Sequence, residues 1–229
     1  MNTLELVSYL RKNILDDTGG QGVDWLSHTE DDADSYQLRW SNEELVSNIS
    51  EAINQVYRRA TPAKDVYLIT TTVGVDTYTL PSYLLKIVQI RNSKGNAVVE
   101  KDIEDIWYSG DVFRTGNPTV YTTDYLTSTI KLFPVPAVSD KLSILMYRLP
   151  LSKLDIYSDK DVELRDEFLL PMLHYAASLC YMKDEANTLD PSRAKFFMEL
   201  FDREFPFTSS YSTIRKSRTS NREVKYGGL

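Results

Sequence analysis

Few side chains in this sequence have the types and spacing that enzymatic chemistry needs. The two histidines are His28, in an acidic stretch, and His174, one residue beyond Leu173 on a strongly apolar helical pattern. We expect His174 at the edge of the core, hydrogen-bonded to a backbone carbonyl. Cys180, the single cysteine, falls on the buried side of the same pattern, where thiols are usually inert. One cysteine also excludes an internal disulfide and a thiolate metal cluster.

Acidic side chains are numerous, but their spacing favours solvated surfaces over catalysis. The cluster at residues 30–34 lacks the glycine and the distal glutamate of an EF-hand calcium loop. The pairs Asp184–Glu185 and Asp202–Glu204 are close neighbours in sequence, whereas glycoside hydrolysis needs carboxylates that face each other across a cleft. The sequence contains no nucleophile-elbow, dinucleotide-binding or P-loop pattern. It therefore predicts no catalytic residue, no metal and no cofactor, and a hydrolase acting on cell-wall glycan is only an alternative.

The net charge of −7 is unevenly distributed along the chain. Residues 206–229 contain five cations and one acid, so this segment is +4 and the preceding residues sum to −11. Apolar side chains are interleaved with the cations, which predicts a docking arm that orders on contact with a partner. The expected contact residues are Tyr211, Ile214, Arg215, Lys216, Arg218, Arg222, Val224, Lys225 and Tyr226. A solubilising terminus and a DNA-binding arm are the alternatives, and the acidic body argues against DNA.

Bulk composition is that of an ordinary soluble globular protein. The chain has 229 residues, of which 42% are hydrophobic and 26% charged. No apolar stretch approaches the ~20 residues of a membrane span, and the first residues lack the apolar core of a signal peptide. We therefore expect synthesis in the cytoplasm and no membrane partner.

Helical patterns occur near both ends of the sequence. Residues 4–14 have apolar side chains every three to four positions, with Thr3 as a plausible cap. Ser41 and Glu44 form a capping box that opens a second helix, expected to end near Ala60.

Two further helices are expected after the central region. One starts near residues 165–168, which places Pro171 in its first turn. Asp190 and Pro191 provide the cap and first position of the other, which Pro206 ends.

Strand patterns fill the interval between these helices. Short apolar alternations are separated by turn sequences such as Ser93-Lys94-Gly95-Asn96 and Gly116-Asn117-Pro118. The expected fold class is α+β: a helical bundle from both chain ends, an inserted small antiparallel β-sheet that is sandwich- or barrel-like, and an extended C-terminal tail. We place the boundaries at residues 1–62, 63–155, 156–205 and 206–229, with an exposed acidic loop at 16–37.

Short motifs follow one another in a distinctive order between about Trp40 and Phe205. They are Trp40-Ser41 with Glu43-Glu44-Leu45, then Tyr78-Thr79-Leu80-Pro81, Gly116-Asn117-Pro118 with Tyr121, Ile130-Lys131-Leu132-Phe133-Pro134-Val135-Pro136, Tyr147-Arg148-Leu149-Pro150, and Leu173-His174-Tyr175-Ala176. In order and spacing they resemble the head-to-tail adaptor (head completion) proteins of tailed bacteriophages. The acidic loop at 16–37 departs from the shorter N-terminal region expected of that family.

The resemblance implies a non-enzymatic subunit of the virion, assembled in the host bacterial cytoplasm. Copies of the chain would form a dodecameric ring beneath the portal protein, join the head to tail, nozzle or neck proteins, and continue the DNA channel. The C-terminal arm would dock on the portal. DNA would pass during ejection without specific binding, because acidic walls do not retain it. A stopper or tail terminator is the alternative, and a β-dominated fold without flanking helices would favour it.

Overall fold

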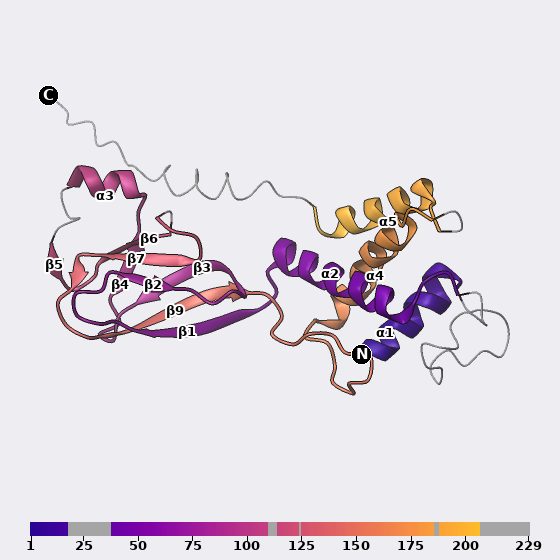
Figure 1. The fold of residues 1–229 in the computed structure, drawn as a ribbon, viewed down its shortest axis with the longest axis horizontal. Helices are drawn as coiled ribbons and strands as arrows, with labels where there is room; N and C mark the ends of the chain where they lie inside the picture. The colour runs from indigo at the N-terminus through magenta and orange to yellow at the C-terminus, as the bar shows by residue number, and fades with distance from the viewer. Residues whose placement is uncertain (18–37, 110–113, 124, 186–187, 207–229) are drawn as a thin grey trace, which may run out of the picture.

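The computed structural model describes residues 1–17, 38–109, 114–123, 125–185 and 188–206. Strands gather at one end of an elongated molecule, and four of its helices gather at the other (Figure 1). We call α1 (Thr3–Tyr9), α2 (Asn42–Ala60), α4 (Asp166–Tyr181) and α5 (Pro191–Glu204) the helical unit, and the strands with α3 (Ile103–Ser109) the β unit. The expected α+β class is therefore confirmed.

The N-terminal helix begins one residue earlier than the sequence suggested. The side chain of Asn2 accepts a hydrogen bond from the Glu5 amide (2.8 Å), and the Glu5 carboxylate accepts one from the Asn2 amide (3.0 Å). Asn2, not Thr3, is thus the cap of α1 (Thr3–Tyr9), and the prediction for Thr3 was wrong. The helix continues as a π-helical turn, η1 (Leu10–Leu15).

The capping box of the second helix is confirmed. The Ser41 hydroxyl accepts from the Glu44 amide (3.1 Å), and the Glu44 carboxylate accepts from the Ser41 amide (2.8 Å). These bonds satisfy amide groups that a helix start leaves without a helical partner. α2 (Asn42–Ala60) ends where expected, with Thr61 in the left-handed region.

The two C-terminal helices start where the sequence predicts. α4 (Asp166–Tyr181) places Pro171 beyond its first turn, contrary to expectation. Proline lacks an amide hydrogen, so α4 forgoes one helical hydrogen bond there. α5 (Pro191–Glu204) is capped by Asp190, whose carboxylate accepts from two backbone amides.

The helical unit has one hydrophobic core that contains residues from both ends of the chain. α4 packs against both α2 and α5, and α1 contacts α2. The fully buried members include Leu6, Leu10, Trp40, Leu45, Ile49, Val56, Met172, Ala176, Cys180 and Phe201. Removal of these side chains from water is the main favourable contribution to the packing.

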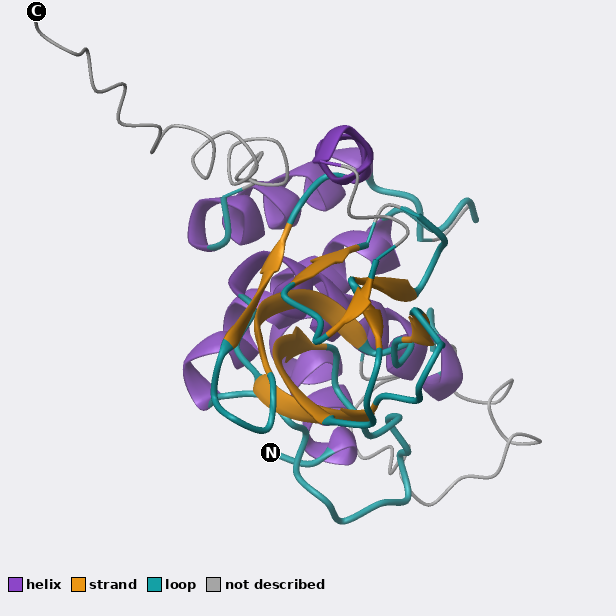
Figure 2. Cartoon of the chain, turned by 90° about the vertical axis from the view of Figure 1, so that its left-hand side faces the viewer, coloured by secondary structure: helices purple, strands orange, loops and turns teal. Residues whose placement is uncertain are grey.

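A curled sheet forms the β unit, in which the strands wrap around a second core (Figure 2). Its order is β1-β9-β3-β4-β6-β7-β2, and a separate pair joins β5 to β8. The strands are β1 (Lys64–Thr70), β2 (Thr77–Thr79), β3 (Leu84–Arg91), β4 (Ala97–Glu100), β5 (Thr115–Gly116), β6 (Val120–Thr122), β7 (Thr129–Phe133), β8 (Val135–Pro136) and β9 (Lys141–Arg148). The arrangement is a half-barrel.

The sequence predicted an antiparallel sheet, and this was wrong for one pair of strands in the curled sheet. β4 and β6 pair in parallel, with Val99 opposite Val120 and Glu100 opposite Tyr121. Parallel neighbours need a crossover connection, because a tight hairpin joins only antiparallel strands. The crossover here contains α3 (Ile103–Ser109), a helix that the sequence reading missed.

None of the helices in the described part of the chain combines the length and apolar character that a bilayer crossing needs.

Candidate functional site: surfaces for assembly

The histidine and the cysteine on α4 lie in settings that disfavour chemistry. The His174 ring stacks on Phe197 at 5.9 Å between centroids, and burial, with Arg203 as the next cause, lowers its pKa. Its Nδ1 is buried and has no hydrogen-bond partner among the described residues, so the expected carbonyl bond to that nitrogen is wrong. Burial raises the pKa of Cys180 to about 12, although Asn48 donates a hydrogen bond to its sulfur (3.2 Å).

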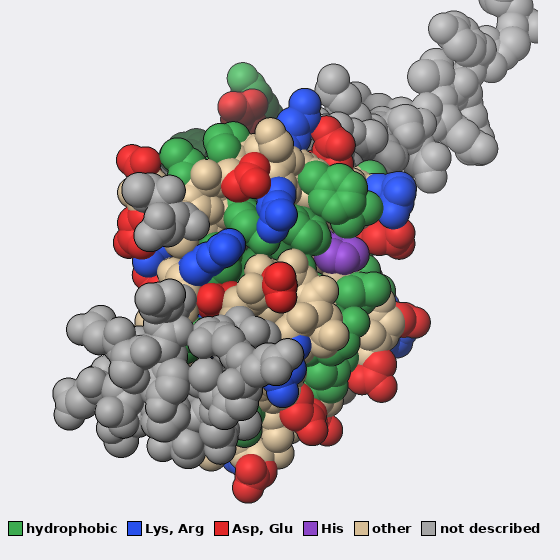
Figure 3. Space-filling view, turned by 90° about the vertical axis from the view of Figure 1, so that its right-hand side faces the viewer, with side chains coloured by type: hydrophobic (Ala, Val, Ile, Leu, Met, Phe, Trp, Pro, Cys, Tyr) green, Lys and Arg blue, Asp and Glu red, His purple; other side chains and the backbone are tan. Residues whose placement is uncertain are grey.

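Each of the two carboxylate pairs named above has a member that contacts a basic side chain. Glu185 pairs with Lys183 (2.9 Å), and Asp202 accepts a hydrogen bond from Arg59. Figure 3 shows the helical end of the molecule, where acidic and basic side chains are interspersed around hydrophobic ones. Within the described ranges, no three His, Cys, Asp or Glu side chains come close enough to hold a metal. The acidic cluster at residues 30–34 and His28 lie outside those ranges.

A buried ion pair connects η1, near the N-terminus, to the start of α2. Arg11 is fully buried and donates to Asp17 Oδ2 (2.5 Å), to the Trp40 carbonyl (2.7 Å) and to Asn42 Oδ1 (2.9 Å). Asp17 Oδ1 accepts from the Arg39 amide (2.9 Å). Asp17 is therefore buried, which corrects its assignment to an exposed loop; the loop's residues 18–37 fall outside the described ranges.

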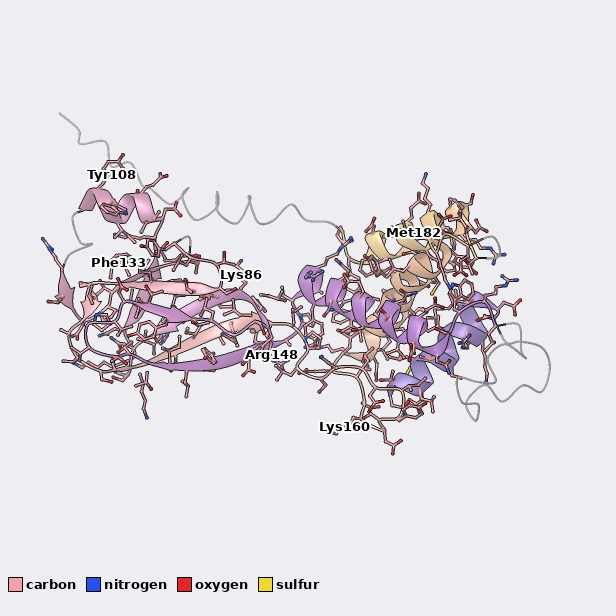
Figure 4. All side chains as sticks on the ribbon, in the orientation of Figure 1. Lys86, Tyr108, Phe133, Arg148, Lys160 and Met182 are labelled. Atoms are coloured by element: carbon pink, nitrogen blue, oxygen red, sulfur yellow. The ribbon has the colours of Figure 1, made fainter. Side chains whose placement is uncertain are left out.

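A second network joins the β unit to the helical unit. Arg148, at the end of β9, donates to both carboxylate oxygens of Glu163, and its Nε lies 3.2 Å from Asp65 (Figure 4). The hydrogen bond from Arg148 holds the pKa of Glu163 below its usual value. The Tyr57 hydroxyl donates to the Glu163 carbonyl, and burial raises the Tyr57 pKa to about 12. These contacts fix how the two units are oriented.

The last described residues of the chain are also anchored. Arg59 on α2 donates to the Phe205 carbonyl (2.9 Å) and to Asp202 on α5. Its guanidinium lies 4.7 Å from the centroid of the Phe201 ring, within range of a cation–π interaction. The end of α5 and Phe205 are therefore fixed to α2.

The predicted contact residues of the arm cannot be placed on this framework. Those residues, Tyr211, Ile214, Arg215, Lys216, Arg218, Arg222, Val224, Lys225 and Tyr226, all lie outside the described ranges.

The structure adds an exposed aromatic feature that sequence reasoning did not find. On α3, Trp107 is 58% exposed and Tyr108 is 92% exposed, while Ile106 is buried beneath the helix. Figure 4 shows Tyr108 on the helix at the far end of the β unit from the helical unit. Exposed aromatic residues are enriched in protein interfaces. The signal in the sequence was the run Ile103-Glu104-Asp105-Ile106-Trp107, whose apolar residues follow helical spacing.

Residues 1–222 match the family model described as SU10 adaptor protein. The chain therefore belongs to the SU10 adaptor protein family, a family of phage head-tail adaptors. A search of curated proteins returned no match.

Membership of this family supports a virion structural protein of the head-tail region and implies a non-enzymatic role. It also implies association with head or portal and tail components.

Proposed function

We propose that this chain forms a dodecameric ring beneath the portal protein, joins the head to tail, nozzle or neck proteins, and continues the DNA channel. The observation that carries the proposal is the adaptor-family match over residues 1–222, which extends into the basic arm. Helices flank the strands in the sequence, whereas a β-dominated fold would have favoured a stopper or tail terminator. The subunit divides into residues 1–62, 63–155, 156–205 and 206–229.

The C-terminal arm is the element that docks on the portal in this proposal. Its root is held by Arg59, so the arm leaves the helical unit from a defined position. Its charge of +4 contrasts with −11 on the preceding residues, so an acidic surface is the expected docking partner of the arm. An acidic channel wall suits a conduit, since passing DNA is repelled and not retained.

The test mixes purified portal with three forms of the chain and images the products by electron microscopy. The full chain should decorate the portal with a ring, and a form truncated after Phe205 should fail to bind. A third form changes Arg215, Lys216, Arg218, Arg222 and Lys225 to Gln and keeps the apolar anchors; its binding should weaken at least tenfold. Portal binding by the truncated form at full affinity would show that the arm is not the docking element.

A further inference from the structure

One face of the β unit is cationic although the protein as a whole is acidic. β1, β9 and β3 are adjacent in the sheet, and their antiparallel registers place alternate side chains on its outer surface. The only acid in these three strands, Asp65, alternates to the inner side and pairs with Arg148 (3.2 Å). The outward cations are Lys64, Lys86, Arg91 and Lys141.

The same face exposes aliphatic side chains at the edge of the sheet. Val66 is 54% exposed and Leu68 is 63% exposed, and Leu145 lies opposite Val66 in the register. β1 is the terminal strand of the sheet, so its outer backbone groups have no neighbouring strand among the described residues. Folded monomers usually protect such an edge with charges, proline or a covering segment. An apolar edge of this length indicates a surface that another protein covers.

A complementary surface occurs on the other side of the β unit. α3 presents exposed acids, Glu104 and Asp105, beside the exposed aromatic rings of Trp107 and Tyr108. In Figure 1, α3 and β1 lie on opposite sides of the β unit, with the other strands between them. One surface combines acids with aromatic rings, and the other combines cations with aliphatic side chains.

We propose that α3 of one copy packs on the outer face of β1 and β9 of the next copy. Glu104 and Asp105 then face Lys64 and Lys86, which lie on either side of Tyr147 in the register, while the aromatic rings of α3 cover the exposed aliphatic residues. Because the two surfaces differ and lie on opposite sides of the subunit, each copy can bind two neighbours in the same way. Repetition of such a head-to-tail contact closes into a ring when the rotation per subunit allows it. This inference deepens the proposed function and rests on it.

The chemistry of the face favours protein over nucleic acid as its occupant. Contacts to DNA are dominated by phosphate groups and are made by cationic and polar side chains. Contact with phosphates does not bury the apolar surface of Val66 and Leu68 favourably, whereas contact with an aromatic ring from α3 removes that surface from water. The acids of α3 also match the cations of the β1–β9 face, and such complementarity selects partners and orientation.

Cysteine crosslinking of the full chain on its portal tests the contact. The double variant Leu68→Cys, Tyr108→Cys carries one reactive position on each surface, and a short bismaleimide should link neighbouring copies. Since every copy supplies both halves, we expect a ladder of covalent multimers on denaturing gels. Each single variant alone should remain monomeric, and an equal mixture of the two single variants should stop at dimers. The buried native Cys180 should not react.

A matched control pairs Leu68→Cys with Tyr157→Cys, at a residue that is 89% exposed in the segment between β9 and α4. This variant should give no ladder. Rings seen by microscopy without a ladder in the α3–β1 variant would overturn the contact and leave the ring function standing. Absence of both rings and ladder would overturn both proposals. Efficient crosslinking of the Leu68→Cys single variant to itself would also overturn the contact, because it would show a two-fold arrangement.

Charge exchange provides a second, independent measurement. Lys64→Glu with Lys86→Glu should reduce the fraction of chain in rings about tenfold, and so should Glu104→Lys with Asp105→Lys. Combining all four changes should restore ring formation, because the opposite charges face each other again. Failure of the combined variant, when it is folded by circular dichroism, would contradict the pairing. DNA binding that is lost in the Lys64→Glu, Lys86→Glu variant, without any change in rings, would assign the face to nucleic acid instead.

Discussion

Arg148 and Glu163 are joined by a two-pronged hydrogen-bonded ion pair that connects the last strand of the β unit to the segment leading into α4. Arg148 Nη1 donates to Glu163 Oε2 at 3.0 Å, and the second prong is formed by Nη2 and Oε1. Planar two-pronged pairs of this kind fix orientation as well as distance. This pair therefore restricts how the β unit is oriented relative to the segment that leads into α4.

We predict that Arg148→Met lowers the free energy of unfolding by about 1–2 kcal/mol, since hydrogen bonds to charged groups are worth this much when partly exposed. Urea denaturation monitored by fluorescence gives the measurement. Arg165→Met is the matched control, because Arg165 and Glu167 form an exposed pair, and it should change stability by less than about 0.5 kcal/mol. Equal effects of the two substitutions would mean that the pair at the joint has no special role.

The same pair predicts a pH dependence of stability. Arg148 lowers the pKa of Glu163 in the folded protein, so the unfolded chain takes up a proton at this site more readily as the pH falls. The stabilisation is therefore fully present above the ordinary glutamate pKa and is lost as the pH falls through the folded value. We expect the stability difference between the wild-type protein and Glu163→Gln to shrink between neutral pH and about pH 3. A difference that stays constant with pH would refute this account.

Loss of the α2 cap should destabilise the helical unit. Ser41→Ala removes the acceptor for the Glu44 amide, and we expect a loss of about 1 kcal/mol in the free energy of unfolding. Ser47→Ala makes the same substitution at an exposed interior position of α2, where it should be neutral or slightly stabilising. Thermal and urea denaturation of both variants separate capping from general helix propensity. If both variants were equally stable, the capping bonds would contribute nothing measurable.

The buried pair of Arg11 and Asp17 should show strong coupling. Arg11→Met leaves the Asp17 carboxylate buried without its cation, which should cost about 3–5 kcal/mol. Asp17→Leu should be similarly harmful, whereas the double variant should recover a large part of the loss. A double-mutant cycle in urea measures this coupling. If the two single substitutions changed the free energy of unfolding additively, Arg11 and Asp17 would not be coupled.

Thiol labelling provides a check on burial in the core. Because burial raises the Cys180 pKa to about 12, the native protein should react with a thiol reagent at least ~100-fold more slowly than a Leu68→Cys variant does at its exposed position. The reaction should become fast in denaturant. Rapid labelling of Cys180 in the native protein would show that α4 opens readily.

Local signals explain which elements could be predicted from the sequence. The capping box of Ser41 and Glu44 and the Asp190–Pro191 start of α5 depend on neighbouring residues, so they were identified correctly. The parallel pairing of β4 with β6 depends on residues far apart in sequence, which no local pattern specifies. α3 was missed because it is only seven residues long, and a helix this short has little stability from propensity alone; Ile106 is its buried residue.

Side-chain burial was the other source of error. The pair of Arg11 and Asp17 was not foreseen, because charged residues are rarely fully buried unless paired, and their pairing requires the fold. The adaptor family was recognised from the order of motifs, and the family match supports it. The docking role of the arm stays a prediction, since its residues lie outside the described ranges.

The Arg11–Asp17 pair has a practical consequence for imaging. Asp17 accepts a hydrogen bond from the Arg39 amide at 2.9 Å, so the described residues on either side of residues 18–37 lie close together. A small fluorescent or electron-dense tag inserted between Asp17 and Arg39 would be attached at two neighbouring points, so we expect it not to distort α1 or α2. Such a tag would let the copies in each particle be counted directly.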